Sequence, residues 1–257
     1  MTSDPLTRWI VSVDIENSGG RSDVAQSVLR RQVYDVVEFA LARAGIDLGR
    51  GSMEDRGDGL LIVIDASTAP SLLLREFPLG LEDALAAFQR MSSDSFRMRL
   101  RVGLSHGAVV RAGGGWAGSD ISDLARLVDS EPVRQAFARA SRAHLALVVS
   151  DYVYRSAVQS NHQGTDQGAY APTEVATRQG GRTLRGWVTI PGYPAPPEDL
   201  PDVRGGRPDE DSVTVLDNHV QVPVIYPPDG RIAPAGHTPP GPPHDPDDDW
   251  PRETSEP

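Results

Sequence analysis

The order of the apolar segments in the first 110 residues restricts the fold of this chain more than any other feature. Short β-branched runs indicate buried strands, whereas apolar residues three and four positions apart indicate helices that bury one face. The pattern predicts a strand, a helix, a two-stranded hairpin, a second helix and a further strand. In order, these segments are Trp9–Asp14, Val24–Leu41, the hairpin Gly51–Asp65, Leu72–Met91 and Phe96–Val110.

This β-α-β-β-α-β order predicts an α/β (α+β) domain with a ferredoxin-like core, in which the first and third strands commonly lie side by side and antiparallel. Asp14 ends the first strand and Asp58 precedes the third, so this pairing would bring both carboxylates to one sheet edge. Two such carboxylates can hold Mg²⁺ or Mn²⁺. The alternative is that Asp14 caps a loop and Asp58 serves only the turn.

The distribution of proline sets the limits of the folded part, because 17 of the 22 prolines fall within 191–257. We therefore expect one domain over 1–190 and a Pro- and Asp-rich, mostly disordered tail over 191–257. Within the domain, the pattern predicts further helices and then strands. They are the helices Ile121–Leu127 and Val133–Ala143 and the strands Leu145–Ser150 and Arg182–Ile190.

Composition excludes several classes of function. The chain has no cysteine, which rules out disulfides, a thiol nucleophile and cysteine-built metal sites. All 25 basic residues are arginine, so no mechanism here uses a lysine, and the formal charge of −11 argues against a nucleic-acid partner. No run approaches the roughly 18 apolar residues of a membrane span, and Met1–Arg8 lacks a cationic and apolar leader pattern. We therefore expect a cytoplasmic protein without a membrane partner.

Four motifs occur in a fixed order and together resemble the catalytic domain of class III adenylyl and guanylyl cyclases. They are Val13-Asp14-Ile15, Gly57-Asp58-Gly59, Arg101–Val110 (RVGLSHGAVV) and Gly118–Leu127 (GSDISDLARL). The resemblance covers roughly residues 8 to 190. It implies the fold of those domains, an extension of the ferredoxin-like core. It also implies conversion of a nucleoside triphosphate to a 3′,5′-cyclic nucleotide and pyrophosphate. Bacterial relatives that make cyclic pyrimidine nucleotides in anti-phage signalling share this scaffold.

The resemblance also assigns roles to residues. Asp14 and Asp58 would bind two divalent ions, either Mg²⁺ or Mn²⁺. The transition-state arginine falls on Arg126, and Ser122 stands where the family normally has asparagine. Family members work as head-to-tail homodimers, so Ser122 and Arg126 would complete the site of a partner chain. Phosphates would contact the backbone N–H groups of Ile15, Glu16, Asn17 and Ser18.

The position that reads the base corresponds to Glu54, as in guanylyl cyclases. A carboxylate there can accept hydrogen bonds from guanine, so GTP is the first expectation and UTP or CTP the second. A second phosphate-contacting lysine of the family is missing, and only an arginine such as Arg155 or Arg182 could replace it. Because Ser122 replaces asparagine, the alternative is a degenerate cyclase-homology domain. Such a domain would bind nucleotide or a protein and act as a regulatory module.

Overall fold

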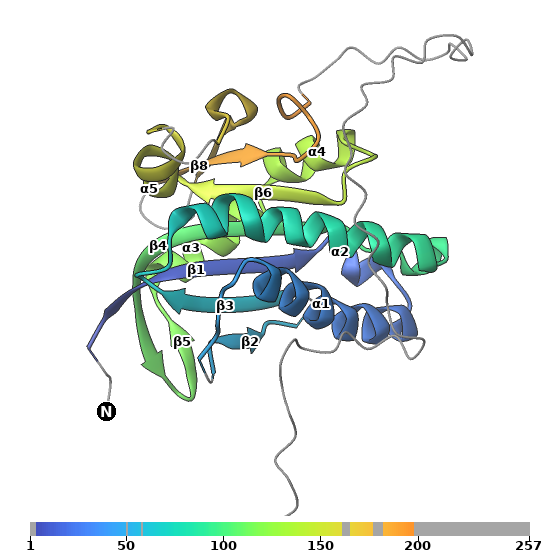
Figure 1. Ribbon diagram of the computed structural model, residues 1–257, viewed down its shortest axis with the longest axis horizontal. Coiled ribbons are helices and arrows are strands. Elements are labelled where there is room, and N and C mark those ends of the chain that lie inside the picture. Colours follow the sequence, from blue (N-terminus) through green and yellow to red (C-terminus); the bar gives the residue numbers. More distant parts are fainter. Residues whose placement is uncertain (1–3, 50, 58, 161–164, 177–181, 198–257) are drawn as a thin grey trace, which may run out of the picture. The chain divides into compact units, whose positions relative to one another are not determined.

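The computed structural model describes residues 4–49, 51–57, 59–160, 165–176 and 182–197, so most of the predicted tail lies outside the described residues. In the described part, eight strands form one sheet in the order β2-β3-β1-β4-β6-β8-β7, with β5 paired to β4 (Figure 1). The strands are β1 (Leu6–Ile15), β2 (Met53–Asp55), β3 (Gly59–Asp65), β4 (Leu100–Ala112), β5 (Gly115–Ala117), β6 (Leu145–Ser150), β7 (Ala171–Ala176) and β8 (Thr183–Thr189).

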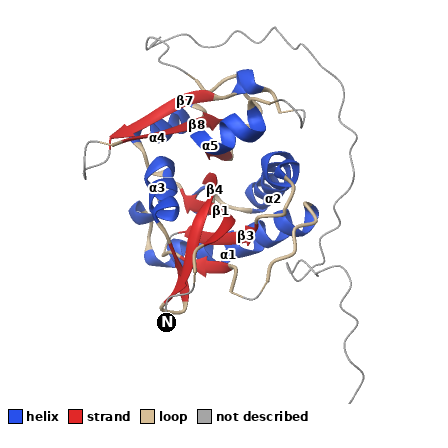
Figure 2. Ribbon diagram, turned by 90° about the vertical axis from the view of Figure 1, so that its left-hand side faces the viewer, coloured by secondary structure: helices blue, strands red, loops and turns tan. Residues whose placement is uncertain are grey.

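Helices cover both faces of this sheet (Figure 2). The α-helices are α1 (Asp23–Arg43), α2 (Phe77–Met91), α3 (Ser119–Val128), α4 (Glu131–Arg139) and α5 (Asp151–Val153). A π-helical turn, Leu72–Glu76, leads into α2, and a second one, Tyr154–Val158, follows α5. Both long helices that the apolar spacing predicts are therefore present.

The predicted pairing of the first and third strands is confirmed. β1 runs antiparallel to β3 on one side, with Asp14 opposite Gly59, and antiparallel to β4 on the other, with Asp14 opposite Arg101. β6 joins β4 in parallel. The end of β1 that carries Asp14 therefore lies between two neighbouring strands near the middle of the sheet.

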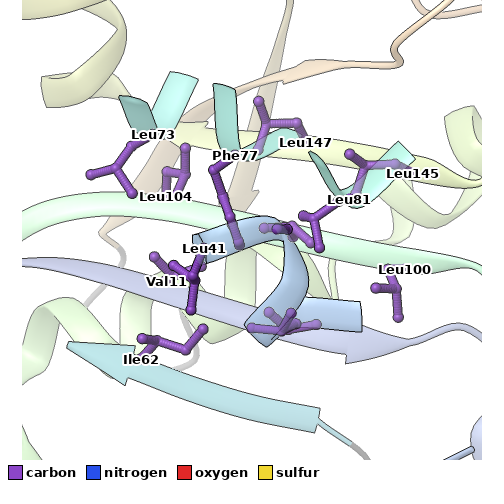
Figure 3. Close-up of a cluster of buried hydrophobic side chains, with 14 of the residues drawn as sticks. Val11, Leu41, Ile62, Leu73, Phe77, Leu81, Leu100, Leu104, Leu145 and Leu147 are labelled. Atoms are coloured by element: carbon purple, nitrogen blue, oxygen red, sulfur yellow. The ribbon is translucent and has the colours of Figure 1, made fainter. Parts of the chain in front are cut away.

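Alternation along β1 divides the core into two layers. Val11 and Val13 face α1 and α2, whereas Ile10 faces α3. Figure 3 shows the first layer, in which Phe77 of α2 packs among side chains from α1 and four strands. Phe77 is fully buried, with an exposed fraction of 0%.

One expectation for β4 is wrong. The alternation of arginine with apolar residues predicts a strand with one solvated face, but Arg101 is only 6% exposed. The reason is that α3 covers that face. A Cβ on Gly103, two residues along the strand, would lie 2.5 Å from Val128 of α3. The strand itself begins at Leu100 rather than Phe96.

Glu82 of α2 is the one group in the described residues whose pKa is carried to near neutrality. Burial raises the pKa of Glu82 from 4.5 to about 7, and Asp83 beside it adds to the rise. The Glu82 Oε2 atom lies 3.6 Å from His144 Nδ1, but burial together with Arg99 and Arg97 lowers the pKa of His144. At neutral pH the contact therefore joins the Glu82 carboxyl group to a neutral imidazole.

Glu82→Gln is expected to change how stability depends on pH. Because the folded pKa is raised, the folded state holds the extra proton, and the free energy of unfolding falls as pH rises from about 4.5 to about 7. Urea unfolding at pH 5 and pH 8 should show the wild type losing about 2.5 kcal/mol more than the variant over this interval. Identical losses in the two proteins would contradict this assignment.

Candidate functional site

Asp14 and Arg101 form the centre of the site. Asp14 is 24% exposed at its side chain, and Arg101 Nε donates to Asp14 Oδ2 at 2.8 Å, with a second bond from Arg101 Nη2. Arg101 Nη2 also lies 3.6 Å from Asp129 Oδ1 at the end of α3. The strand register explains this pair, since directly opposed residues project from the same face.

The β2–β3 hairpin lies against the same end of β1. Gly59 is the residue opposite Asp14, and a Cβ there would stand 2.0 Å from the Val13 carbonyl oxygen. The two strands can approach so closely only because this position is glycine. Asp58, the second predicted metal ligand, is outside the described residues, but its neighbour Gly59 is thus held against β1.

Glu54 projects from the same sheet face as Asp14. Ser12, Leu61 and Glu54 stand opposite one another on β1, β3 and β2, and Asp14 follows Ser12 by two residues. Glu54 Oε2 accepts from Arg56 Nη2 at 2.9 Å. Glu54 Oε1 is buried and has no hydrogen-bond partner among the described residues. An unsatisfied buried acceptor is costly, so this oxygen favours the approach of a donor.

The connection from β1 to α1 holds the predicted phosphate-contacting residues. Ile15 is buried, the Glu16 N–H donates to the Arg99 carbonyl oxygen at 2.9 Å, and Asn17 adopts a left-handed conformation (φ 54°). Ser18, which is 8% exposed, begins a short 3₁₀ turn. Because the Glu16 N–H is already engaged, only the other N–H groups of this loop are candidates for phosphate.

A cleft of about 410 Å³ adjoins this loop. Its walls are Ile15 and Ser18, the first turns of α1, and Gly57 of the hairpin. Ser22 caps α1, with its Oγ accepting from the Ala25 N–H at 3.3 Å. The N-terminal end of a 21-residue helix, with its positive dipole, therefore opens onto the cleft.

The predicted transition-state residues lie on α3. Leu124, Leu127 and Val128 bury the inner side of this helix, while the Arg126 side chain is 52% exposed. Ser122 lies one turn before Arg126, and its Oγ is 3.5 Å from the Gly118 carbonyl oxygen. In the described residues, no hydrogen bond or ion pair joins Ser122 or Arg126 to Asp14 or Glu54.

Arg155 and Arg182, the two candidates for a second phosphate contact, lie on different surfaces. Arg126 Nη1 and Arg182 Nη1 each lie 3.1 Å from an oxygen of Asp123. Arg155 instead pairs with Asp151 of α5. Arg182 is therefore the candidate that shares a surface with Arg126.

The oxygen donors fit a divalent cation. Within the described ranges, no group of three or more His, Cys, Asp or Glu side chains could hold a metal ion by itself. Mg²⁺ needs fewer protein ligands when it is bound with a nucleotide, since one or two carboxylates and the phosphates complete its shell. Asp14, partly exposed at the strand end, matches that requirement, and Asp58 next to Gly59 is the second candidate.

Solved structures with similar folds are catalytic domains of nucleotide cyclases. An adenylate/guanylate cyclase/hydrolase from Silicibacter pomeroyi superposes with a TM-score of 0.50 at 20% identity, covering 74% of this chain and 99% of that one. This chain has the class III nucleotidyl cyclase fold. The adenylyl cyclase CyaB from P. aeruginosa has a TM-score of 0.48 at 10% identity, covering 75% of this chain and 97% of that one. No protein-family model and no curated protein matches the sequence.

Two features of this cyclase fold were not expected from the sequence, namely the Asp14–Arg101 pair and the contact between Arg56 and Trp116. The sequence pattern places Arg101 within the third motif but assigns it no role. The antiparallel register of β1 and β4 would have found it, because Asp14 and Arg101 are opposed. The bond from Arg56 Nη2 to the Trp116 carbonyl oxygen (3.0 Å) joins the hairpin to β5, a strand that the sequence pattern did not reveal.

None of the helices in the described part of this cyclase-fold chain has the length and apolar character needed to cross a bilayer.

Proposed function

We propose that this chain is a nucleotidyl cyclase, which converts a nucleoside triphosphate to a 3′,5′-cyclic nucleotide and pyrophosphate in the cytoplasm. One observation carries the proposal. The Asp14 carboxylate stands at the end of a central strand, beside the hairpin that contains Asp58, and the next residue, Ile15, lines the cleft at the start of α1. Three of the four motifs thus meet at one end of β1, through Asp14, Gly59 and Arg101, while the fourth lies on α3.

Positive groups at this edge suit a triphosphate. The N-terminal turn of α1 and the N–H groups of Asn17 and Ser18 would contact the phosphates. The Arg101 guanidinium donates to Asp14, and its remaining N–H groups would donate to a phosphate oxygen. Two divalent ions held by Asp14 and Asp58 would neutralise the triphosphate and lower the pKa of the ribose 3′-hydroxyl.

Arg126 is assigned to the transition state through a second copy of the chain. Its exposed side chain faces away from the sheet that carries Asp14, so a head-to-tail homodimer would bring it to the phosphates of the partner's nucleotide. Arg182, held beside it by Asp123, would be the second cation at those phosphates. Guanidinium groups stabilise charge that develops on a transferred phosphoryl group. Ser122, one turn before Arg126, would orient the ribose through its hydroxyl or a water molecule.

Glu54 is assigned to base recognition, with GTP first and UTP second. Guanine and uracil both present a ring N–H next to a carbonyl oxygen, and the unpartnered Glu54 Oε1 can accept from that N–H. Adenine and cytosine lack this donor. CTP therefore ranks below UTP on this ground.

Glu54→Gln is expected to reduce the preference for GTP over ATP, measured as the ratio of the two kcat/KM values, by about tenfold. The physical reason is that an amide presents both a donor and an acceptor and no charge. Glu38→Gln, an exposed change on α1, is the matched control and should leave the ratio unchanged. An unaltered ratio in Glu54→Gln would remove Glu54 from base recognition.

The proposal is tested by incubating the purified chain with GTP, UTP, CTP and ATP in turn with Mn²⁺ and separating the products. We expect a cyclic nucleotide and pyrophosphate in equal amounts, with GTP the best substrate. Nucleotide binding without product would favour the regulatory module, for which the replacement of asparagine by Ser122 is the supporting observation.

A further inference from the structure

A second, basic cleft lies near the loop Ile15–Ser18 and shares no lining residue with the first cleft. It has a volume of about 580 Å³ and lies between the C-terminal end of α2, the segment before β4 and the segment before β6. Four arginines and a histidine line it, namely Arg90, Arg97, Arg99, Arg142 and His144. Residues 1–197 contain 22 acidic and 21 basic residues, so this gathering of charge is local and does not follow from the composition.

Helix ends attract arginine side chains, and this effect applies to Arg99 and to Arg90, which lies in the last turn of α2, but not to Arg97. Arg99 donates to the carbonyl oxygens of Phe137, Ala140 and Ala143 at the C-terminal end of α4, and its guanidinium lies 3.8 Å from the centre of the Phe137 ring. Arg99 is therefore a structural cap as well as a wall of the cleft.

The other three arginines are exposed and little neutralised. Arg97 pairs with the exposed Asp94 at 3.0 Å. Arg90 and Arg142 make no ion pair or side-chain hydrogen bond with any described residue. Like charges brought together repel one another, and a multivalent anion in the cleft would relieve that repulsion. The field of the cluster already reaches His144, since Arg99 and Arg97 help to lower its pKa.

We propose that this cleft is an anion site for a diphosphate group, held by Arg90, Arg97 and Arg142. Arginine forks match phosphate oxygens in pairs, and three guanidinium groups from separate segments suit two linked phosphates better than one. Free pyrophosphate and the diphosphate of a nucleotide share this chemistry. The site stands independently of the proposed cyclase activity.

Arg99 connects the cleft to the loop Ile15–Ser18. Its Nη1 lies 2.9 Å from Glu16 Oε2, and its carbonyl oxygen accepts from the Glu16 N–H. An anion in the cleft competes with Glu16 for this guanidinium. Occupation of the cleft would thereby loosen the loop next to the proposed nucleotide site. This loosening can be measured whether or not the chain is a cyclase, but its effect on catalysis rests on the proposed function.

The test is calorimetric titration of the full chain with inorganic pyrophosphate, and separately with ADP, in EDTA at about 0.15 M salt. Arg90→Gln/Arg142→Gln should weaken binding about 30-fold or more, because two charge-assisted contacts are lost. Arg31→Gln/Arg75→Gln makes the same change in net charge at exposed positions outside both sites and should leave the affinity within about threefold. Arg126→Gln/Arg182→Gln separately measures any binding at the proposed nucleotide site. Whichever of the two probes binds more tightly identifies the source of the diphosphate.

Three results would overturn the site. They are no measurable binding of either probe, equal weakening in Arg90→Gln/Arg142→Gln and Arg31→Gln/Arg75→Gln, and weakening confined to Arg126→Gln/Arg182→Gln. The last result would place the anion at the proposed nucleotide site and leave the cyclase proposal standing. Hydrogen exchange of Glu16–Ser18 in the Arg126→Gln/Arg182→Gln background should speed up on adding pyrophosphate, and unchanged exchange would overturn the link through Arg99.

Discussion

Asp58→Ala is expected to lower Mn²⁺-dependent cyclic nucleotide formation by about 10³-fold, equivalent to about 4 kcal/mol of transition-state stabilisation. The proposal gives this carboxylate a metal ligand's role at an edge where Gly59 is held against β1. The free energy of unfolding should change by less than about 1 kcal/mol, because an aspartate in the turn sequence Gly57-Asp58-Gly59 is expected to contribute little apolar packing. Turnover at several Mn²⁺ concentrations, with urea unfolding of the same samples, measures both quantities.

Asp65→Ala is the matched control, since Asp65 ends the same strand at its far side and is 61% exposed at its side chain. It should retain wild-type turnover within about twofold. Wild-type turnover in Asp58→Ala would show that this residue does not hold a metal needed for the reaction.

Phe77→Ala is expected to reduce the free energy of unfolding by about 3 to 5 kcal/mol. Phe77 is fully buried where α2, α1 and the sheet meet (Figure 3), so truncation leaves a cavity in the main core layer. Leu79→Ala, two residues further along α2, is the control, because Leu79 is 47% exposed and its loss should cost about 0.5 kcal/mol or less. Denaturant unfolding with equal m-values measures the difference. Equal losses would contradict the assigned orientation of α2.

The elements that the sequence predicts correctly carry strong local signals. The aliphatic run of β3 and the apolar spacing of α1 depend on neighbouring residues alone. β7 was missed because Pro172 argues against a strand, and the structure resolves this conflict by placing β7 at the edge of the sheet, where proline is tolerated. β5 was missed because it has three residues and depends on pairing with β4.

Some features of the candidate site could likewise be predicted from the sequence, and others depend on long-range contacts. The antiparallel pairing of β1 with β3 could be anticipated from element order, and with it the approach of the hairpin to Asp14. The burial of Arg101 could not, because it depends on α3 crossing β4 at Gly103, a contact between segments some twenty residues apart. Long-range contacts of this kind leave no mark on local periodicity. For the same reason, the bracketing of Asp123 by Arg126 and Arg182 appears only in three dimensions.

In the proposed cyclase, Asp58 of one chain and Arg126 of another would complete a single site. The most direct measurement mixes two inactive variants, Asp58→Ala and Arg126→Ala, and follows cyclic nucleotide formation. Half of the randomly assorted dimers would contain one intact site of two, so turnover should return to about a quarter of the wild-type value. A mixture that forms dimers yet stays as inactive as its components would contradict the account.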